Sequence, residues 1–190
     1  MLCKTKRLQK YINRLTLLVA MAMGLDGFYV CAQVRGQFIV KEGDEAPSFS
    51  YVAMDGDTLD TDFMRGRVTL LQFAASWCPF SQAQLLDIQE FIYDKYSSYA
   101  EFDIMVFCVD TTENAQSKFK EIIETDGVKL PYSYDRDNHI YNLFSTPKGN
   151  VTRSVIIDRE WRIVELHDLH TWRNLKQMRR TVKRLLRKED

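Results

Sequence analysis

Two continuous apolar runs predict the central strands of this chain. Residues 68–74 are apolar except for Thr69 and Gln72, and residues 102–109 are a second, mostly apolar run. A strand that other elements cover on both faces shows such continuity in place of strict alternation. Both runs are therefore predicted to be buried strands.

Three stretches show the three-to-four-residue spacing of apolar positions that is typical of helices packed on a core. They are residues 79–96, residues 111–126 with Gly127 as a C-terminal stop, and residues 171–187 at the end of the chain. The residues predicted to face the core from these helices are Leu85, Ile88 and Ile92; Phe119, Ile122 and Ile123; and Trp172, Leu175, Val182 and Leu185.

Shorter segments complete the predicted topology: a hairpin, a short helical passage and two further strands. They are, in that order, residues 49–54 with 58–60 around the turn signal Asp55-Gly56-Asp57, residues 136–144, residues 153–157 and residues 161–166. The resulting order, strand–helix–strand–helix–hairpin–helix, predicts an α/β sandwich with a mixed sheet and helices on both faces.

Charge changes this picture only at the N terminus. The whole chain balances 26 basic against 26 acidic residues, so no basic excess points to nucleic-acid binding. Residues 1–32, however, carry five basic residues and one acidic residue, and their basic stretch runs into the apolar run 15–25. This pattern is typical of a signal peptide, because the run has the length of an h-region and is short for a bilayer span.

The end of this segment leaves three outcomes open. Val30 and Ala32 are acceptable small residues at positions −3 and −1 for cleavage before Gln33. The alternatives are an uncleaved anchor, which Asp26 opposes, and a lipidated Cys31. Each outcome predicts an exported protein, in the periplasm or on the outer face of a membrane.

The segment Trp77-Cys78-Pro79-Phe80-Ser81 lies between the first buried strand and the helix that follows it. Two of the four cysteines belong to the leader, so the domain keeps Cys78 and Cys108, too few for a disulfide-stapled scaffold. Cys78 would take the N-cap and Pro79 the first helical position. Because the positive end of a helix lowers the pKa of a thiol, we predict an accessible, reactive thiol at Cys78; the alternative is a buried structural cysteine.

This segment resembles the thioredoxin superfamily and, more narrowly, the TlpA/ResA-type exported thioredoxins, whose fold is related to that of the AhpC/TSA peroxiredoxins. The narrower resemblance rests on residues 43–49 (GDEAPSF), 64–68 (MRGRV) and 155–158 (VIID), and it covers about residues 40–188 of a domain expected at 33–190. It implies a thioredoxin-like three-layer sandwich that carries out thiol–disulfide chemistry without a cofactor or a metal.

Three positions depart from what the resemblance implies. The second cysteine of the motif falls at Ser81, which can hydrogen-bond to a Cys78 thiolate but cannot resolve a mixed disulfide. The buried acid of thioredoxins falls at Gln72. The cis-proline opposite the motif falls at Thr152, and the Val151–Thr152 bond is expected to be trans, because a cis bond costs a non-proline residue roughly 2.5–4 kcal/mol. Substrate docking at this loop is therefore expected to differ from that of the family.

For other candidate groups the sequence favours structural roles. Cys108 could resolve Cys78, but a small buried core residue is the favoured interpretation. The segment His167-Asp168-Leu169-His170 has no third metal ligand and is expected to be a solvated loop.

Peroxidase chemistry needs a threonine where Ala75 stands, and Arg153 lies one residue from the place of the peroxiredoxin arginine. A solvated face is favoured over lipid contact for the basic residues of the last helix, namely Arg173, Lys176, Arg179, Arg180, Lys183, Arg184 and Arg187.

The sequence thus predicts a monothiol thiol–disulfide oxidoreductase outside the cytoplasm. Cys78 would attack the disulfide of a protein or a small molecule, and an external thiol would resolve the adduct. Two alternatives remain: a redox-inactive thioredoxin-fold binding module with a vestigial Cys78, and a peroxiredoxin-like peroxidase. The expected surroundings of the thiol, besides Ser81, are Trp77, Pro79, Phe80, Val151 and Thr152.

Overall fold

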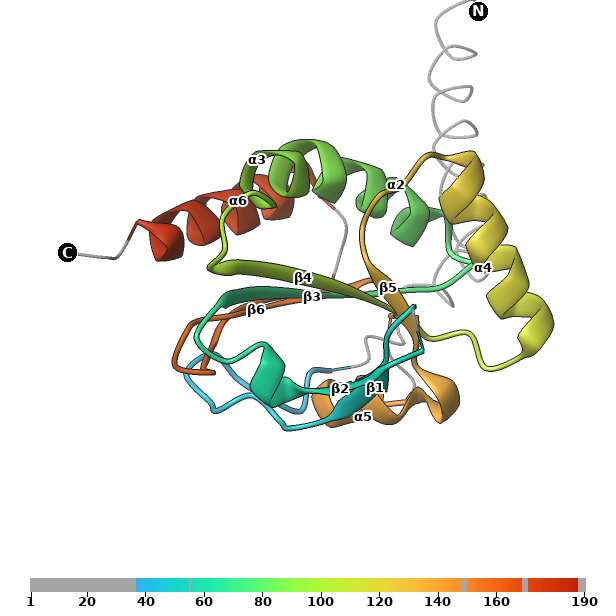
Figure 1. Ribbon diagram of the computed structural model, residues 1–190, viewed down its shortest axis with the longest axis horizontal. Coiled ribbons are helices and arrows are strands. Elements are labelled where there is room, and N and C mark those ends of the chain that lie inside the picture. Colours follow the sequence, from blue (N-terminus) through green and yellow to red (C-terminus); the bar gives the residue numbers. More distant parts are fainter. Residues whose placement is uncertain (1–36, 55, 148–149, 169–170, 188–190) are drawn as a thin grey trace, which may run out of the picture. The chain divides into compact units, whose positions relative to one another are not determined.

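The computed structural model describes residues 37–54, 56–147, 150–168 and 171–187 (Figure 1). The expected leader at residues 1–32 lies outside the described residues. Among the residues that are described, no helix combines the length and the apolarity needed to cross a membrane.

A five-stranded mixed sheet in the order β5-β4-β3-β6-β7 forms the centre of the fold. The two apolar runs are confirmed as its central strands, β3 (Val68–Ala74) and β4 (Phe102–Cys108), which pair in parallel. On the other side of β3, β6 (Arg153–Ile157) and β7 (Ile163–His167) are each antiparallel to their neighbour. The C-terminal ends of β3 and β4 therefore meet at one edge of the sheet, and the Cys78 segment follows β3 there.

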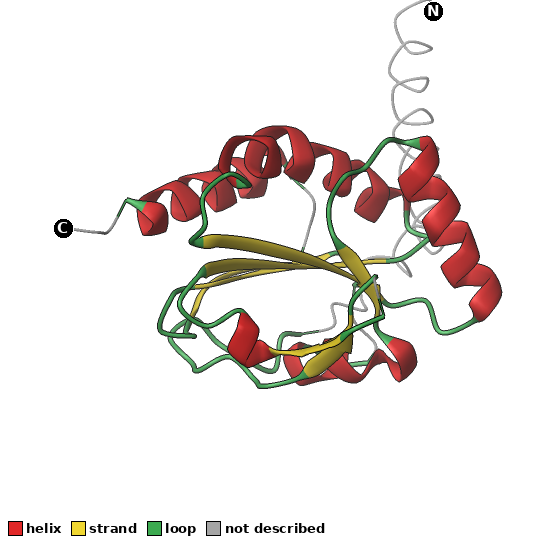
Figure 2. Cartoon of the chain, in the orientation of Figure 1, coloured by secondary structure: helices red, strands yellow, loops and turns green. Residues whose placement is uncertain are grey.

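The long helices cover one face of this sheet (Figures 1 and 2). The predicted helix at 79–96 is confirmed but is not uniform, because a π-helical segment interrupts it. In chain order these elements are α2 (Pro79–Ile88), the π-helical segment Gln89–Tyr93, α3 (Asp94–Tyr96), α4 (Glu113–Thr125) and α6 (Trp172–Leu186). The N-cap threonines of α4 and α6, Thr112 and Thr171, accept hydrogen bonds from backbone N–H groups inside each helix, which fixes where the helices begin.

Smaller elements cover the opposite face. The predicted hairpin is confirmed, since β1 (Ser50–Val52) pairs antiparallel with β2 (Thr58–Asp60). A 3-10 turn at Thr61–Phe63 follows it, and a second at Arg136–Asn138 leads into α5 (His139–Phe144). The sheet thus lies between two covering layers, as the predicted α/β sandwich requires.

One strand and two helix positions differ from the sequence-based expectations. Ile122 of α4 was expected to face the core but is only half-buried. The edge strand β5 (Tyr132–Tyr134), which is parallel to β4, was not predicted. Three residues between Pro131 and Asp135 are too few to show any periodicity. Trp172, the first residue of α6, was expected to face the core but is 50% exposed. Its ring packs edge-on against Phe91 of the π-helical segment, with 4.8 Å between the ring centroids.

The apolar face of α2 offers a direct test of this packing. Leu85 is 1% exposed and belongs to the core on the helix-covered face, whereas its neighbour Leu86 is 40% exposed. We expect Leu85→Ala to lower the free energy of unfolding by about 2–5 kcal/mol, because it removes buried surface and leaves a cavity. Leu86→Ala is the matched control and should change it by less than about 1 kcal/mol. Urea unfolding followed by circular dichroism measures both, and equal losses would contradict the assigned face.

Candidate active site

Cys78 stands at the start of α2, directly after the central strand β3. It is the N-cap residue of the helix, with extended backbone angles, and Pro79 takes the first helical position, as predicted. The backbone N–H groups of the first turn point toward an N-cap side chain and carry partial positive charge. The end of a buried strand thus delivers the Cys78 thiol to the positive end of a helix.

Two hydroxyl groups hold the sulfur there. The Sγ atom of Cys78 lies 3.4 Å from Oγ1 of Thr152, which enters the site from the segment before β6. Thr152 Oγ1 also lies 3.3 Å from Oγ of Ser81 and donates to it, and the Ser81 hydroxyl accepts a further bond from the backbone N–H of Ala75 at 3.4 Å. Because both acceptor contacts of Ser81 are occupied, its own proton remains available for the Cys78 sulfur.

These contacts shift the acidity of the thiol. Burial acts to raise the pKa of Cys78, but hydrogen bonds from the Ser81 and Thr152 side chains and from the backbone of Ser81 and Phe80 outweigh it, so the pKa lies below that of an ordinary thiol. Each of these donors stabilises a negative sulfur more than a neutral one. When the proton leaves, the Thr152 hydroxyl can turn from Ser81 toward the thiolate, because a hydroxyl group rotates freely about its C–O bond.

The thiol is more covered than expected. Cys78 is 7% exposed, because Thr152 lies against its sulfur. The motif residues on either side of Cys78 are open, with Trp77 63% and Phe80 69% exposed, and Pro79 is also exposed. The site is therefore a recessed sulfur flanked by two exposed aromatic rings.

The loop opposite the motif agrees with the sequence-based expectation. No cis peptide bond occurs within the described ranges, which include Val151 and Thr152. Asn150 shapes this loop: its side-chain oxygen accepts a bond from the backbone N–H of Thr152 at 3.3 Å, and its amide donates to the carbonyl of Asp168 at 2.6 Å. A threonine side chain thus takes the place opposite Cys78.

Beside the thiol, buried amides stand where the family resemblance implies an acid. Gln72 is fully buried, and its side-chain oxygen accepts bonds from Ser154 at 2.6 Å and from Gln84 at 3.3 Å. Gln84 comes from α2 and also donates to the Ser154 hydroxyl at 2.8 Å. The registers Gln72↔Ser154 and Ser154↔His167 extend this polar row across three strands. Gln72 and Gln84 carry no proton-accepting carboxylate, so they cannot deprotonate Cys78.

Cys108 is confirmed as a core residue. It pairs in register with Ala74, so both cysteines lie toward the same sheet edge, yet it is fully buried. Burial raises the pKa of Cys108 far above that of an ordinary thiol, with the nearby Asp110 and Asp135 carboxylates adding to the shift. The Cys108 thiol therefore stays neutral and donates a hydrogen bond to Asp110, at 3.3 Å. Both cysteines of the described chain are free thiols.

Asp110 is a site residue that sequence reasoning missed. It is 3% exposed, and its Oδ2 atom accepts a 2.7 Å bond from the backbone N–H of Ser76, two residues before Cys78. Gln116 of α4 donates to its carbonyl at 2.9 Å, which fixes the residue from the other side. The sequence could have identified Asp110, because it follows the buried strand β4, and the C-terminal ends of the parallel strands β3 and β4 meet at one edge of the sheet. Asp110 thus fixes the backbone that presents the thiol.

The histidine segment is not the solvated loop that the sequence predicted. His167 is the last residue of β7, is buried, and makes a hydrogen bond with the buried Glu165. Strand pairing with Ser154 carries it into the covered face of the sheet. His170 lies outside the described residues. No group of three metal-binding side chains occurs in the parts of the chain that the structure describes.

The described contacts of Arg153 are with Asn150, Phe38 and Tyr141. Its Nε donates to the carbonyl of Asn150 at 2.9 Å, and its guanidinium lies over the rings of Phe38 and Tyr141 at 4.4 and 5.9 Å. Strand alternation turns it to the face opposite from Ser154 and the amide row. The described contacts of Arg153 therefore lie on the face of the sheet that α5 covers, opposite the long helices.

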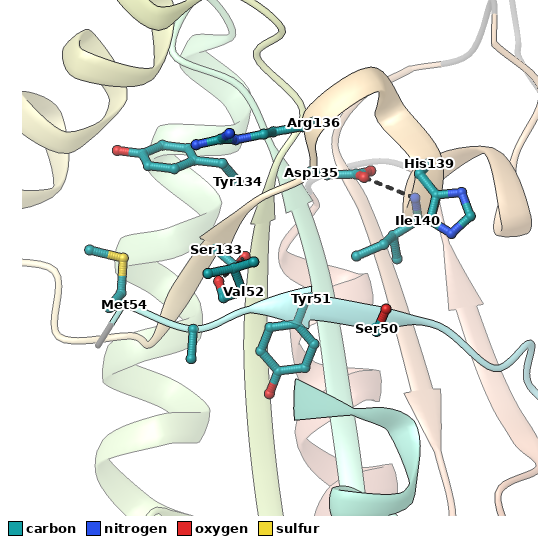
Figure 3. A pocket seen from close by; sticks show the side chains of 11 residues that line it. Ser50, Tyr51, Val52, Met54, Ser133, Tyr134, Asp135, Arg136, His139 and Ile140 are labelled. Carbon is teal, nitrogen blue, oxygen red and sulfur yellow. Dashed lines mark hydrogen bonds between the residues drawn. The ribbon is translucent and has the colours of Figure 1, made fainter. Parts of the chain in front are cut away.

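A pocket of about 490 Å³ lies apart from Cys78, between β1, β5 and the start of α5 (Figure 3). Tyr51, Val52 and Ile140 give it apolar walls, and none of its lining residues belongs to the motif or to the loop at Thr152. Asp135 points from this side to the start of α5 and accepts the backbone N–H of Ile140 at 2.9 Å. The residues that line this pocket are therefore separate from those that surround Cys78.

Comparisons with known proteins agree with this geometry. The Redoxin family model matches residues 41–179. The thiol-disulfide oxidoreductase ResA of Bacillus thuringiensis (strain Al Hakam) is 25% identical over 157 residues, 80% of this chain and 87% of its own. The thioredoxin-like protein YneN of Bacillus subtilis (strain 168) is 24% identical over 132 residues, 67% and 72% of the two chains.

Among solved structures, a candidate protein disulfide isomerase from Bacteroides thetaiotaomicron superposes with a TM-score of 0.75 at 27% identity, covering 81% of this chain and 95% of the other. These findings confirm the resemblance to TlpA/ResA-like members of the thioredoxin superfamily and the thioredoxin-like fold.

The Thr152 hydroxyl can be tested as a donor to the sulfur. In Thr152→Val the pKa of Cys78 should rise, because the thiolate loses a hydrogen bond while its burial remains. Alkylation of Cys78 at pH 7, followed on its own peptide by mass spectrometry, should slow several-fold, and its pH midpoint should move upward. Thr152→Ser should restore the wild-type midpoint, and the exposed Thr58→Val is the matched control. An unchanged midpoint in Thr152→Val would show that this contact does not tune the thiol.

Proposed function

Because the chain belongs to the Redoxin family, we propose that it is an extracytoplasmic thiol–disulfide oxidoreductase that acts through Cys78 alone. One observation carries this proposal: a sulfur at the start of α2 receives hydroxyl and backbone hydrogen bonds that lower its pKa, and the neighbouring motif position is Ser81. A lowered pKa increases the fraction of thiolate, which is the form that attacks disulfides.

The reaction has two exchange steps. The Cys78 thiolate attacks one sulfur of a substrate disulfide R–S–S–R′, forms a Cys78–S–S–R bond and releases R′–S⁻, which takes a proton from water. A second, external thiolate R″–S⁻ then attacks the R sulfur, forms R–S–S–R″ and releases the Cys78 thiolate. The net result is R–S–S–R′ + R″–S⁻ → R–S–S–R″ + R′–S⁻, in which R″ is oxidised, R′ is reduced and Cys78 ends unchanged. A second external thiolate R″–S⁻ then releases R–S⁻ and forms R″–S–S–R″, so full reduction of the substrate disulfide consumes two external thiols.

The monothiol character follows from the two sites where a resolving sulfur would be expected. Ser81 lies one helical turn after Cys78 and carries oxygen, so it stabilises the thiolate but cannot form a disulfide. Cys108 is fully buried and its pKa is raised, so it stays a neutral thiol and does not attack. Resolution therefore depends on a thiol from outside the chain.

The surface around the sulfur favours a protein as the substrate. Trp77 and Phe80 together expose large aromatic area beside a nearly covered thiol. Exposed aromatic side chains of this kind provide contact area for protein partners. A protein disulfide that packs on both rings is held while its sulfur reaches Cys78. The basic and apolar pattern of residues 1–32 supports export, which places this chemistry where disulfides persist.

Two other functions use the same fold. A redox-inactive binding module would also use Trp77 and Phe80, but it would not need the donor set that lowers the pKa of Cys78. A peroxidase would need a cation near the sulfur, whereas the described contacts of Arg153 lie with Asn150, Phe38 and Tyr141. The geometry of the thiol therefore favours disulfide exchange.

Ser81→Cys tests whether the missing resolver limits the wild type. The new sulfur would lie one helical turn from Cys78, close enough for a reversible disulfide, and the substitution changes little volume. Reduction of a disulfide-bonded test protein with dithiothreitol should become faster in this variant, on the order of tenfold, because the mixed disulfide no longer waits for an external thiol.

Ser98→Cys is the matched control, because it adds an exposed thiol just after α3, at the far end of the same helical stretch. It should leave the rate unchanged. A Ser81→Cys protein that forms the internal disulfide but gains no activity would contradict the assigned role of Ser81. The loop at Thr152 would then limit turnover, and the binding module would become the better account.

A further inference from the structure

The solvent-facing side of α6 is almost entirely cationic. Nine residues between 172 and 187 are exposed, and two of them are Trp172 and Gln177. The other seven are Arg173, Lys176, Arg179, Arg180, Lys183, Arg184 and Arg187. Residues 171–187 contain no acidic side chain. Apart from Gln177, every long polar side chain that is exposed on α6 therefore carries a positive charge.

Nothing in the described part of the chain neutralises these charges. The ion pairs of the described residues lie elsewhere, at Arg65, Arg67, Lys120 and His167. On α6 itself, Lys176 contacts the ring of Trp172 at 5.1 Å, and the other six cations face solvent. Cations suit the last turn of a helix, which accounts for Lys183 and Arg184 but not for those of the first two turns.

The rest of the domain has the opposite charge. Outside α6 and its cap at Arg187, residues 33–190 carry 14 basic and 25 acidic side chains. Solubility alone does not explain a cationic face on an acidic body, because the acidic excess already keeps the domain soluble. Like charges three and four positions apart also destabilise the helix that carries them. This face is therefore suited to an anionic partner.

We propose that the outer face of α6 is a docking surface for an anionic membrane. The apolar side of the helix, with Leu175, Met178 and Val182, is buried in the core, so α6 cannot insert and must bind through charge at the headgroup level. A lipid surface contacts one face only and leaves the acidic body away from the negative charge. Trp172, half exposed at the start of α6, suits the interfacial layer.

The sequence at the other end of the chain supports a membrane over another polyanion. The basic stretch before the apolar run 15–25 has the pattern that directs a chain to a membrane. A nucleic acid would also have to approach an acidic body, which a single cationic helix does not shield beyond about 10 Å at ordinary ionic strength. The membrane is therefore the occupant that the charge distribution fits best.

Flotation of the full-length chain with lipid vesicles tests this surface. One set of vesicles contains phosphatidylcholine alone, and the other contains 30% phosphatidylglycerol. The test variant is Arg179→Gln/Arg180→Gln/Lys183→Gln/Arg184→Gln. The matched control, Lys41→Gln/Lys95→Gln/Lys118→Gln/Lys129→Gln, removes as many exposed cations from other elements. Binding to the neutral vesicles reports any insertion of the N-terminal segment, so the ratio of anionic to neutral binding isolates charge.

The wild type should prefer the anionic vesicles, and 0.5 M salt should abolish this preference, since screening shortens the range of the attraction. The α6 variant should lose it by on the order of 600-fold, because each of the four cations removed contributes about fivefold, while the control keeps most of it. Equal loss in both variants, or no loss in either, would overturn the proposal. Unchanged vesicle binding with lost heparin binding in the α6 variant would overturn it in favour of a polyanion.

Discussion

The contact between the Cys78 sulfur and the Thr152 hydroxyl, 3.4 Å long, determines what this site can do. It joins the end of β3 to the segment before β6, 74 residues later, and it covers the thiol while stabilising the thiolate. The strand pairs Gln72↔Ser154 and Phe73↔Arg153 hold these two segments in register. Asp110 holds the remaining side through the backbone of Ser76. The reactivity of one sulfur thus depends on three strands.

Much of this arrangement could be predicted from the sequence. The mostly apolar runs at 68–74 and 102–109 predicted the central strands, and the position of Pro79 predicted where α2 begins. The substitutions at Ser81, Gln72 and Thr152 could be recognised as departures because each is a single position in a motif. These features are local, so a pattern along the chain reveals them.

What could not be predicted is the set of contacts between distant segments. The covering of Cys78 depends on the rotamer of Thr152, and no local pattern specifies it. The burial of His167 depends on its register with Ser154. The place of Gln84 in the buried polar row depends on its bond with Ser154, which lies 70 residues later in the chain. Contacts between segments far apart in the chain decide all three, and sequence periodicity does not reveal such contacts.

The two surfaces for which we propose functions differ in physical character. Near Cys78 the surface is aromatic, with Trp77 and Phe80 exposed, which suits contact with a protein. Along α6 it is cationic and suits a surface of fixed negative charge. A domain held at a membrane by α6 would meet its protein substrates in two dimensions and at a higher local concentration.

The central claim is that Cys78 is an activated thiol that no sulfur of the domain resolves. Intact-mass analysis after exposure to a disulfide-bonded test protein tests this most directly. The account predicts one covalent adduct, mapped to Cys78, that persists until an external thiol is added and forms equally in Cys108→Ala. A domain that loses two hydrogens to form a Cys78–Cys108 disulfide, or that forms no adduct at Cys78, would contradict it.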